Sequence, residues 1–147
     1  MLDYKVKSFQ ELNTKELYEL LQLRSEVFVV EQDCVYQDVD GKDEKALHVL
    51  GFHNDTIAAY SRIFKPGDYF DAASIGRVVI SPKLRGQKTG YKLMKVSMNA
   101  IKENFKTDTI EISAQVYLKS FYNNLGFIEK GASYLEDGIS HIAMVYS

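Results

Sequence analysis

Hydrophobic and polar residues alternate in several short runs along this chain, a pattern typical of β-strands with one covered face. Asn54-Asp55 and Pro66-Gly67-Asp68 separate three of these runs and are typical turn sequences, so we expect an antiparallel meander in this region. The turn signal Glu136-Asp137-Gly138 indicates a final hairpin. The predicted strands cover residues 4–8, 48–53, 57–62, 74–80, 109–114, 127–134 and 141–146.

Apolar residues recur at helical spacing in three other segments. The first predicted helix runs for about four turns from Asn13, which has Glu16 in capping-box register, to Phe28. The second covers residues 93–105, and the third covers residues 117–124 and ends at Gly126. The element order β-α-β-β-β-α-β-α-β-β predicts one α+β domain over residues 1–147, with a mixed, mostly antiparallel sheet of about six to seven strands flanked by helices.

Composition places the chain among ordinary globular proteins, with 46% hydrophobic and 26% charged residues. Apolar runs such as Val27–Val30 are too short to cross a bilayer, and the N-terminus has no signal-peptide pattern, so we expect a cytoplasmic protein without a membrane partner. Three histidines without paired spacing and a single cysteine predict no metal site. Cys34 is expected to be an inert structural thiol or a thiol near an acceptor pocket.

Charge is strongly segregated along the sequence. Residues 72–102 contain seven cations and no acid, so this window carries +7, while the whole chain carries −2 and the remainder −9. This separation indicates one bound anion and not a uniformly basic surface for nucleic acid. Residues 31–44 hold six acids, which predicts a loop that is a solvated surface, a partner for arginines such as Arg24 and Arg62, or an attractor of a cationic substrate.

The basic window contains a candidate phosphate site. A predicted strand is followed by the turn Arg85-Gly86-Gln87-Lys88-Thr89-Gly90 and then by a predicted helix. A turn of this kind presents backbone N–H groups and the positive end of a helix dipole to an anion. The spacing does not fit a P-loop, and the third glycine and early βαβ unit of a dinucleotide fingerprint are absent. We therefore expect a phosphate-bearing cofactor of another kind.

Residues Arg85–Gly90 resemble the acyl-CoA-binding loop of the GNAT superfamily of N-acetyltransferases, whose pattern is Gln/Arg-x-x-Gly-x-Gly/Ala. The preceding strand Arg77–Pro82 and the segment Gln115–Phe127 are similar to neighbouring motifs of that family. Longer stretches resemble its ElaA-like branch, namely Arg24–Gln32, Tyr36–Asp43, Ser113–Gln115 and Tyr134–Ile142. The resemblance covers nearly the whole chain and implies the acyl-CoA N-acyltransferase (GNAT) fold.

The resemblance implies that acetyl-CoA is the co-substrate and that it binds where the fourth and fifth strands splay apart. The backbone of Val78, Val79 and Ile80 is then expected to hold the pantetheine arm, with Gln115 beside it. The pyrophosphate is expected on the backbone amides of the loop that follows. The residues of that loop are Arg85, Gly86, Gln87, Lys88, Thr89 and Gly90.

An acceptor amine would attack the thioester directly, which leaves proton transfer as a task for side chains. Tyr122 matches the family's tyrosine and is expected to protonate the departing thiolate. Glu31 and His141 are favoured as acceptor-site residues from a wider set of candidate bases that also contains His48, Glu111 and Glu136. An amine with a pKa near neutral would need only water.

Lys88 stands where the family pattern has its first glycine. With ordinary helical backbone angles a lysine is harmless there, because the ligand contacts are made by backbone N–H groups. A positive φ would instead lower cofactor affinity by an amount on the order of 1 to 2 kcal/mol. We expect Lys88 to be a tolerated substitution.

The predicted function is acetyl transfer from acetyl-CoA to a primary amine of a small molecule or peptide. An acyl-CoA-binding module without turnover is the alternative, because Lys88 departs from the pattern and no base is fixed. Acyl-homoserine lactone synthesis is a less favoured alternative, although Arg24, Phe28 and Glu31 resemble the N-terminal signature of acyl-homoserine lactone synthases. Nucleic acid is not an expected partner. Exposed strand edges could pair between two copies of the chain, so a homodimer is compatible with the sequence.

Overall fold

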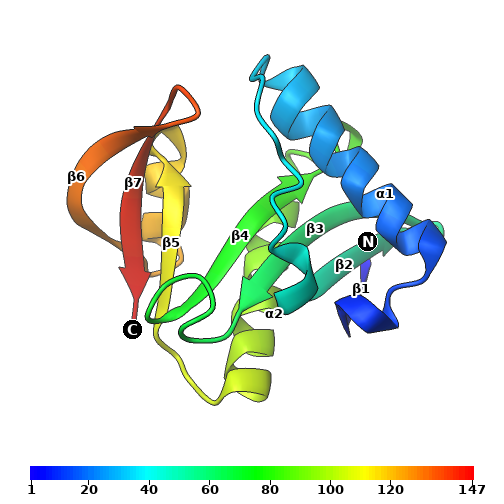
Figure 1. Ribbon diagram of the computed structural model, residues 1–147, viewed down its shortest axis with the longest axis horizontal. Coiled ribbons are helices and arrows are strands. Elements are labelled where there is room, and N and C mark those ends of the chain that lie inside the picture. Colours follow the sequence, from blue (N-terminus) through cyan, green and yellow to red (C-terminus); the bar gives the residue numbers. More distant parts are fainter.

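The chain folds around one seven-stranded sheet with helices on both faces (Figure 1). The computed structural model describes residues 1–147. The strands are β1 (Asp3–Ser8), β2 (Leu47–His53), β3 (Thr56–Phe64), β4 (Ala73–Ile80), β5 (Ile110–Gln115), β6 (Ile128–Glu136) and β7 (Ile139–Tyr146), and the helices are α1 (Thr14–Arg24), α2 (Thr89–Phe105) and α3 (Lys119–Asn124). The predicted α+β class and element order are confirmed.

The strand order is β1-β2-β3-β4-β5-β7-β6, and every neighbouring pair is antiparallel except β4 and β5. The predicted meander is β2, β3 and β4. Asn54 and Asp55 both have positive φ, 51° and 65°, as a tight hairpin turn requires. Strand β3 is central, with eight of its nine residues buried, and this explains its near-continuous apolar sequence.

The two faces of the sheet are covered by different helices. Val49 and Ala59 belong to the larger core, under α2 residues such as Leu93. The next residues along β2 and β3, Leu50 and Tyr60, belong to a second core under α1. This alternation follows from the two-residue period of a strand, and it produces the three layers visible in Figure 1.

The first helix begins at the predicted capping box. Asn13 Oδ1 accepts a hydrogen bond from the Glu16 backbone at 2.8 Å, and Glu16 Oε1 accepts one from the Asn13 backbone at 3.0 Å. Beyond α1 the chain continues as widened π-helical turns over Ser25–Glu31, a geometry that the sequence pattern does not reveal. No helix of the structure combines the length and apolar character needed to cross a membrane.

A buried ionic network, here called the Arg–Asp cluster, attaches the acidic segment to the sheet. It consists of Arg24, Arg62, Arg77, Asp38, Asp40 and Asp43. Asp43 Oδ1 lies 2.7 Å from Arg24 Nη1 and 3.0 Å from Arg62 Nη1, and the two arginine side chains are only 0% and 1% exposed. Of the three interpretations of the acidic segment, pairing with arginines of the same chain is the one that these three aspartates show.

His48 lies beneath the same cluster. Its Nδ1 is 2.6 Å from the Tyr60 hydroxyl and its Nε2 is 2.9 Å from the Asp43 carbonyl oxygen. Burial lowers the pKa of His48, so the ring is neutral and its two nitrogens are both used in structural hydrogen bonds. His48 therefore connects β2 and β3 to the acidic segment and is a poor candidate for a base.

Removal of the Asp43 carboxylate should strongly destabilise the fold. Asp43→Ala leaves two buried guanidinium groups without their shared partner, and the expected loss is about 3–5 kcal/mol of unfolding free energy in urea titration. Glu44→Ala removes an exposed neighbouring carboxylate and should change the same quantity by less than about 0.5 kcal/mol. Equal losses in the two variants would contradict the role assigned to the cluster.

The cluster also predicts a loss of stability in acid. Burial alone would raise the pKa of Asp43, but hydrogen bonds and charge from Arg24 and Arg62 outweigh it and lower the pKa. A lowered folded-state pKa gives stability that is complete above the unfolded value, near pH 4, and is lost as pH falls through the folded value. Unfolding free energy measured between about pH 5 and about pH 2 should fall less steeply in Asp43→Asn than in the parent chain.

Candidate active site

Strands β4 and β5 diverge after a short parallel contact. Only Ala73 and Ser74 of β4 pair with β5, through Ile110 and Glu111. From Ile75 onward the edge of β4 that faces β5 has no strand partner, and Figure 1 shows the two strands separating. The predicted splay of the fourth and fifth strands is confirmed, and it leaves backbone N–H and C=O groups available to an extended ligand.

A cavity of about 600 Å³ occupies the gap between the two strands, a size typical of small-molecule sites. Gln87 and Glu31 are the two predicted site residues that do not line it. The other predicted residues all do, namely Val78, Val79, Ile80, Arg85, Gly86, Lys88, Thr89, Gly90, Gln115, Tyr122 and His141. The fold therefore brings most of the predicted site into one space.

A β-bulge interrupts β4 at the cavity wall. Tyr60 pairs with Val79 and Arg62 pairs with Gly76, so Arg77 and Val78 together face the single residue Ser61. Arg77 has φ 49°, a rare conformation for a residue with a side chain. Its guanidinium is anchored in the Arg–Asp cluster, with Nε 2.7 Å from Asp38 Oδ1. The bulge changes the direction of the backbone in the part of β4 that no longer pairs with β5. No local sequence pattern predicts it.

The loop between β4 and α2 has the backbone geometry of an anion site. Gly86 has φ 85°, and Thr89 Oγ1 donates a hydrogen bond to the Leu84 carbonyl at 3.0 Å, which closes the loop onto the helix start. A Cβ atom at Gly90 would lie 3.3 Å from the Phe121 ring, so glycine permits the close approach of α2 to α3. The first turn of α2 contains no acid, and its free N–H groups and dipole therefore favour an anion.

Lys88 does not have ordinary helical angles. It forms the N-cap of α2 in the left-handed region, with φ 58° and ψ 21°. The conformation is the one that the family's glycine would adopt without cost, so the lysine carries a backbone strain that glycine would not. The harmless interpretation, which required helical angles, is therefore wrong, although the lysine is accommodated in the folded chain.

Arg85 forms a bidentate ion pair with Glu31. The two guanidinium nitrogens Nη1 and Nη2 lie 2.5 and 2.8 Å from the carboxylate oxygens, and both side chains are about two-fifths exposed. The hydrogen bond to Arg85 lowers the pKa of Glu31, so this carboxylate is a weaker base than an unpaired glutamate. Its predicted acceptor-side role stays a prediction, and its contact in the structure is with Arg85 of the loop between β4 and α2.

Tyr122 lies on α3 with its side chain 7% exposed, on the wall of the cavity. The rings of Phe121 and Phe127 hold it, with centroid distances of 5.0 and 6.0 Å. Burial raises the pKa of Tyr122 well above its usual value, so the phenol keeps its proton at neutral pH. A protonated hydroxyl in this place is suited to act as an acid.

Gln115 ends β5 and faces the same space. Its Nε2 donates to Gln32 Oε1 at 3.4 Å, while its Oε1 is buried without a hydrogen-bond partner. A buried carbonyl oxygen without a partner is costly, and a donor on a bound ligand would satisfy it. This orphaned atom fits the predicted contact with an amide-containing pantetheine arm.

Three side chains from β5, β6 and β7 line the opposite side of the cavity, namely Ser113, Glu136 and His141, and the Tyr134 ring stacks on His141. His141 is 7% exposed, and its Nδ1 lies 2.7 Å from the Ile139 carbonyl oxygen. Its Nε2 is 3.7 Å from Glu136 Oε2. Glu136 is one of the candidate bases predicted from the sequence, and its position beside His141 depends on the register of the hairpin.

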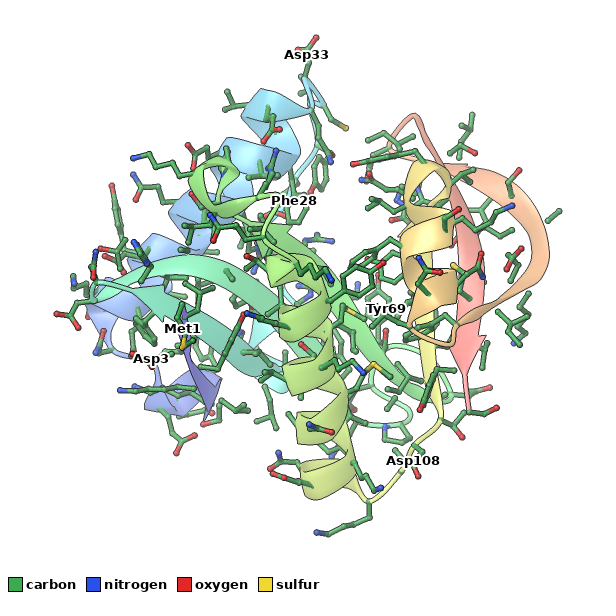
Figure 2. All side chains as sticks on the ribbon, turned by 180° about the vertical axis from the view of Figure 1, so that it is seen from behind. Met1, Asp3, Phe28, Asp33, Tyr69 and Asp108 are labelled. Atoms are coloured by element: carbon green, nitrogen blue, oxygen red, sulfur yellow. The ribbon has the colours of Figure 1, made fainter.

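Residues outside the predicted site set also line the cavity. Cys34 is buried and lines it, and its thiol donates to the Asp137 carbonyl at 3.3 Å, which agrees with a thiol near an acceptor pocket. Phe28, in the turns after α1, and Tyr69, in the loop between β3 and β4, also line the cavity and are labelled in Figure 2. No group of three or more His, Cys, Asp or Glu side chains is placed to hold a metal ion.

Comparison with known sequences identifies the family. The profile described as "Acetyltransferase (GNAT) domain" matches residues 9–147. The chain belongs to this family of acetyltransferases. Protein ElaA of Escherichia coli (strain K12) is 42% identical over 146 residues, which are 98% of this chain and 95% of ElaA. The resemblance to the ElaA-like branch is thereby confirmed.

Solved structures of GNAT proteins share the whole architecture. The crystal structure of Escherichia coli ElaA superimposes with a TM-score of 0.92 at 41% identity, and an acyl-CoA N-acyltransferase from Pseudomonas aeruginosa with 0.95 at 40%, each over 100% of both chains. The AHL synthase LasI reaches 0.79 at 16% identity over 99% of this chain and 89% of LasI. That last likeness shows a shared fold and says nothing of a shared reaction.

The backbone at Lys88 gives a prediction for cofactor affinity. Since Lys88 already has φ 58° in the folded chain, glycine relieves the same strain before and after binding. Lys88→Gly should therefore change acetyl-CoA affinity by less than tenfold in calorimetry. By the same argument Gly86→Ala, which places a Cβ at φ 85°, should lower the free energy of unfolding by about 1–2 kcal/mol and change acetyl-CoA affinity by less than tenfold. A gain above tenfold for Lys88→Gly would show that strain at Lys88 arises on binding.

Proposed function

We propose that this chain transfers the acetyl group of acetyl-CoA to a primary amine of a small molecule or peptide. The observation that carries the proposal is the open edge of β4, which shares one cavity with the phosphate loop and Tyr122. A relative 40% identical over its full length is described as an acyl-CoA N-acyltransferase, which supports acyl-CoA as the donor. Acetyl is the proposed acyl group.

The donor would be held mainly by backbone groups. The open edge of Val78–Ile80 offers an extended pantetheine arm the same hydrogen bonds that a neighbouring strand would make. Gln115 Oε1, buried and unpaired, is placed to accept from an amide of that arm. The N–H groups of Gly86–Gly90 and the start of α2 would hold the pyrophosphate, with Arg85 and Lys88 supplying charge.

The protein's chemical task is then to orient the amine and to manage protons. Direct attack forms the new C–N bond at the thioester carbon, and the C–S bond breaks with the electron pair leaving on sulfur. Tyr122, protonated and buried, would give its proton to that thiolate. Tyr122 is only 7% exposed, and this burial would limit the access of water to a thioester bound beside it.

Two assays separate transfer from binding alone. Acetyl-CoA affinity is measured by calorimetry, and CoA release is measured with a thiol reagent against polyamines, amino acids, aminoglycosides and peptides. Release that depends on an added amine supports the transferase. Tight acetyl-CoA binding without release above the Tyr122→Phe background, for every acceptor, would support the non-catalytic acyl-CoA-binding module.

Loss of the Tyr122 hydroxyl should slow transfer without weakening donor binding. Tyr122→Phe is expected to lower kcat by about 100-fold, the usual contribution of a general acid, with acetyl-CoA affinity unchanged. Tyr117→Phe, which removes an exposed hydroxyl at the same cavity, is the control and should change kcat by less than about threefold. A full rate in Tyr122→Phe would remove Tyr122 from the mechanism.

A further inference from the structure

The charges around the cavity differ between its sides. Arg62 and Arg77 line it, but the Arg–Asp cluster already balances them with aspartates of the same chain. Glu136 and Asp137 also line it, on the turn of the β6–β7 hairpin. The ion pairs of the chain give Glu136 only His141 as a partner and give Asp137 none. The side of the cavity formed by this turn is therefore acidic.

The β6–β7 hairpin holds Glu136 in place. A bulge between Lys130 and Tyr134 shifts the register of β6 on β7 and re-aims the tip of the hairpin. Glu136 Oε1 accepts a hydrogen bond from Ser113 Oγ at 3.3 Å, and Ser113 is also hydrogen-bonded to the Tyr134 hydroxyl. The Glu136 side chain remains 44% exposed, so a ligand can reach its carboxylate.

His141 presents an unpartnered nitrogen to the same place. Its Nδ1–H donates to the Ile139 carbonyl at 2.7 Å, and this bond assigns the proton to Nδ1 and leaves the lone pair on Nε2. The 3.7 Å from Nε2 to Glu136 Oε2 is too long for a hydrogen bond. His141 lines the cavity and its Nε2 makes no hydrogen bond within the chain, so a ligand in the cavity can reach this nitrogen.

Aromatic rings also line the cavity. Tyr36, Phe64 and Tyr69 offer apolar surface to an alkyl chain, and cations of the same chain, Arg77, Arg62 and Lys42 respectively, already lie over the three rings. Tyr69 and Glu136 both line the cavity, and burial and, after it, the charge of Glu136 raise the pKa of Tyr69. Figure 2 labels Tyr69 between the β4 side and the β5 side of the molecule.

We propose that Glu136 and His141 bind the acceptor as its ammonium ion and accept its proton, and that the acceptor is a cationic alkylamine without a carboxylate. This inference rests on the proposed transfer reaction. The Glu136 carboxylate binds the ammonium, and His141 Nε2 takes one proton, which frees the nitrogen lone pair for attack on the thioester carbon. Tyr122 protonates the thiolate and recovers the second proton of the nitrogen, and the imidazolium beside Glu136 returns its proton to solvent.

Binding can be tested apart from turnover. Cadaverine is titrated by calorimetry into the chain saturated with CoA. Glu136→Gln should weaken cadaverine binding at least tenfold. Glu103→Gln makes the same change at an exposed carboxylate of α2 that does not line the cavity, and it should change binding by less than threefold. Glu136→Gln binding within threefold of the parent chain would overturn the proposal.

A matched pair of acceptors tests the charge preference. Cadaverine and 6-aminohexanoate have the same five-carbon spacing, but the second replaces one ammonium by a carboxylate. CoA release should favour cadaverine at least tenfold in kcat/KM, and Glu136→Gln should reduce that preference at least threefold. Equal use of the two acceptors by the parent chain would overturn the assigned substrate class, while transfer itself would stand.

The proton-accepting step has its own variant. His141→Asn keeps a donor toward the Ile139 carbonyl but lacks the Nε2 acceptor, so kcat near neutral pH should fall about 100-fold and then rise with pH as more free amine becomes available. Acetyl-CoA affinity should not change. A pH profile identical to that of the parent chain would overturn the role of His141. Glu136-dependent cadaverine binding without any CoA release would support the ammonium site and refute the transferase.

Discussion

The incomplete pairing of β4 with β5 is the constraint on which the rest of the structure depends. Two residue pairs join the strands at their base, and beyond Ser74 the backbone edge of β4 is open. A sheet pays for such a break in lost ladder hydrogen bonds, so the surrounding structure has to hold it open. The larger core spans both sides at the base, from Ala73 to Met144, and keeps the two halves of the sheet in one domain.

The Arg–Asp cluster fixes the wall on the β4 side. Arg24 from the end of α1, Arg62 from β3 and Arg77 from the β4 bulge all bind aspartates of the acidic segment. Buried charges of this kind add little net stability over apolar packing, yet they demand one geometry, because an unpaired partner is very costly. The cluster thus connects the strained backbone at Arg77 to the segment that covers the site.

The residues after α1 contact elements on both sides of the gap between β4 and β5. Glu31 pairs with Arg85 of the β4–α2 loop, Gln32 accepts from Gln115 of β5, and Cys34 donates to the carbonyl of Asp137 in the β6–β7 turn. Three contacts within four residues therefore join this loop, β5 and the β6–β7 turn. The π-helical turns of Ser25–Glu31 set the direction in which this segment leaves the helix.

The sequence by itself determined the elements, because caps, turns and periodicity act over a few residues: the Asn13–Glu16 box and the Asn54-Asp55 turn are where their patterns indicated. Similarity to GNAT motifs also predicted the gap between β4 and β5 and the loop that lines it. Only the tertiary structure decided the partners of the acidic segment, the positive φ of Arg77 and Lys88, and the meeting of Glu136 with His141. Those features depend on strand register, bulges and contacts between distant residues, and no local pattern records them.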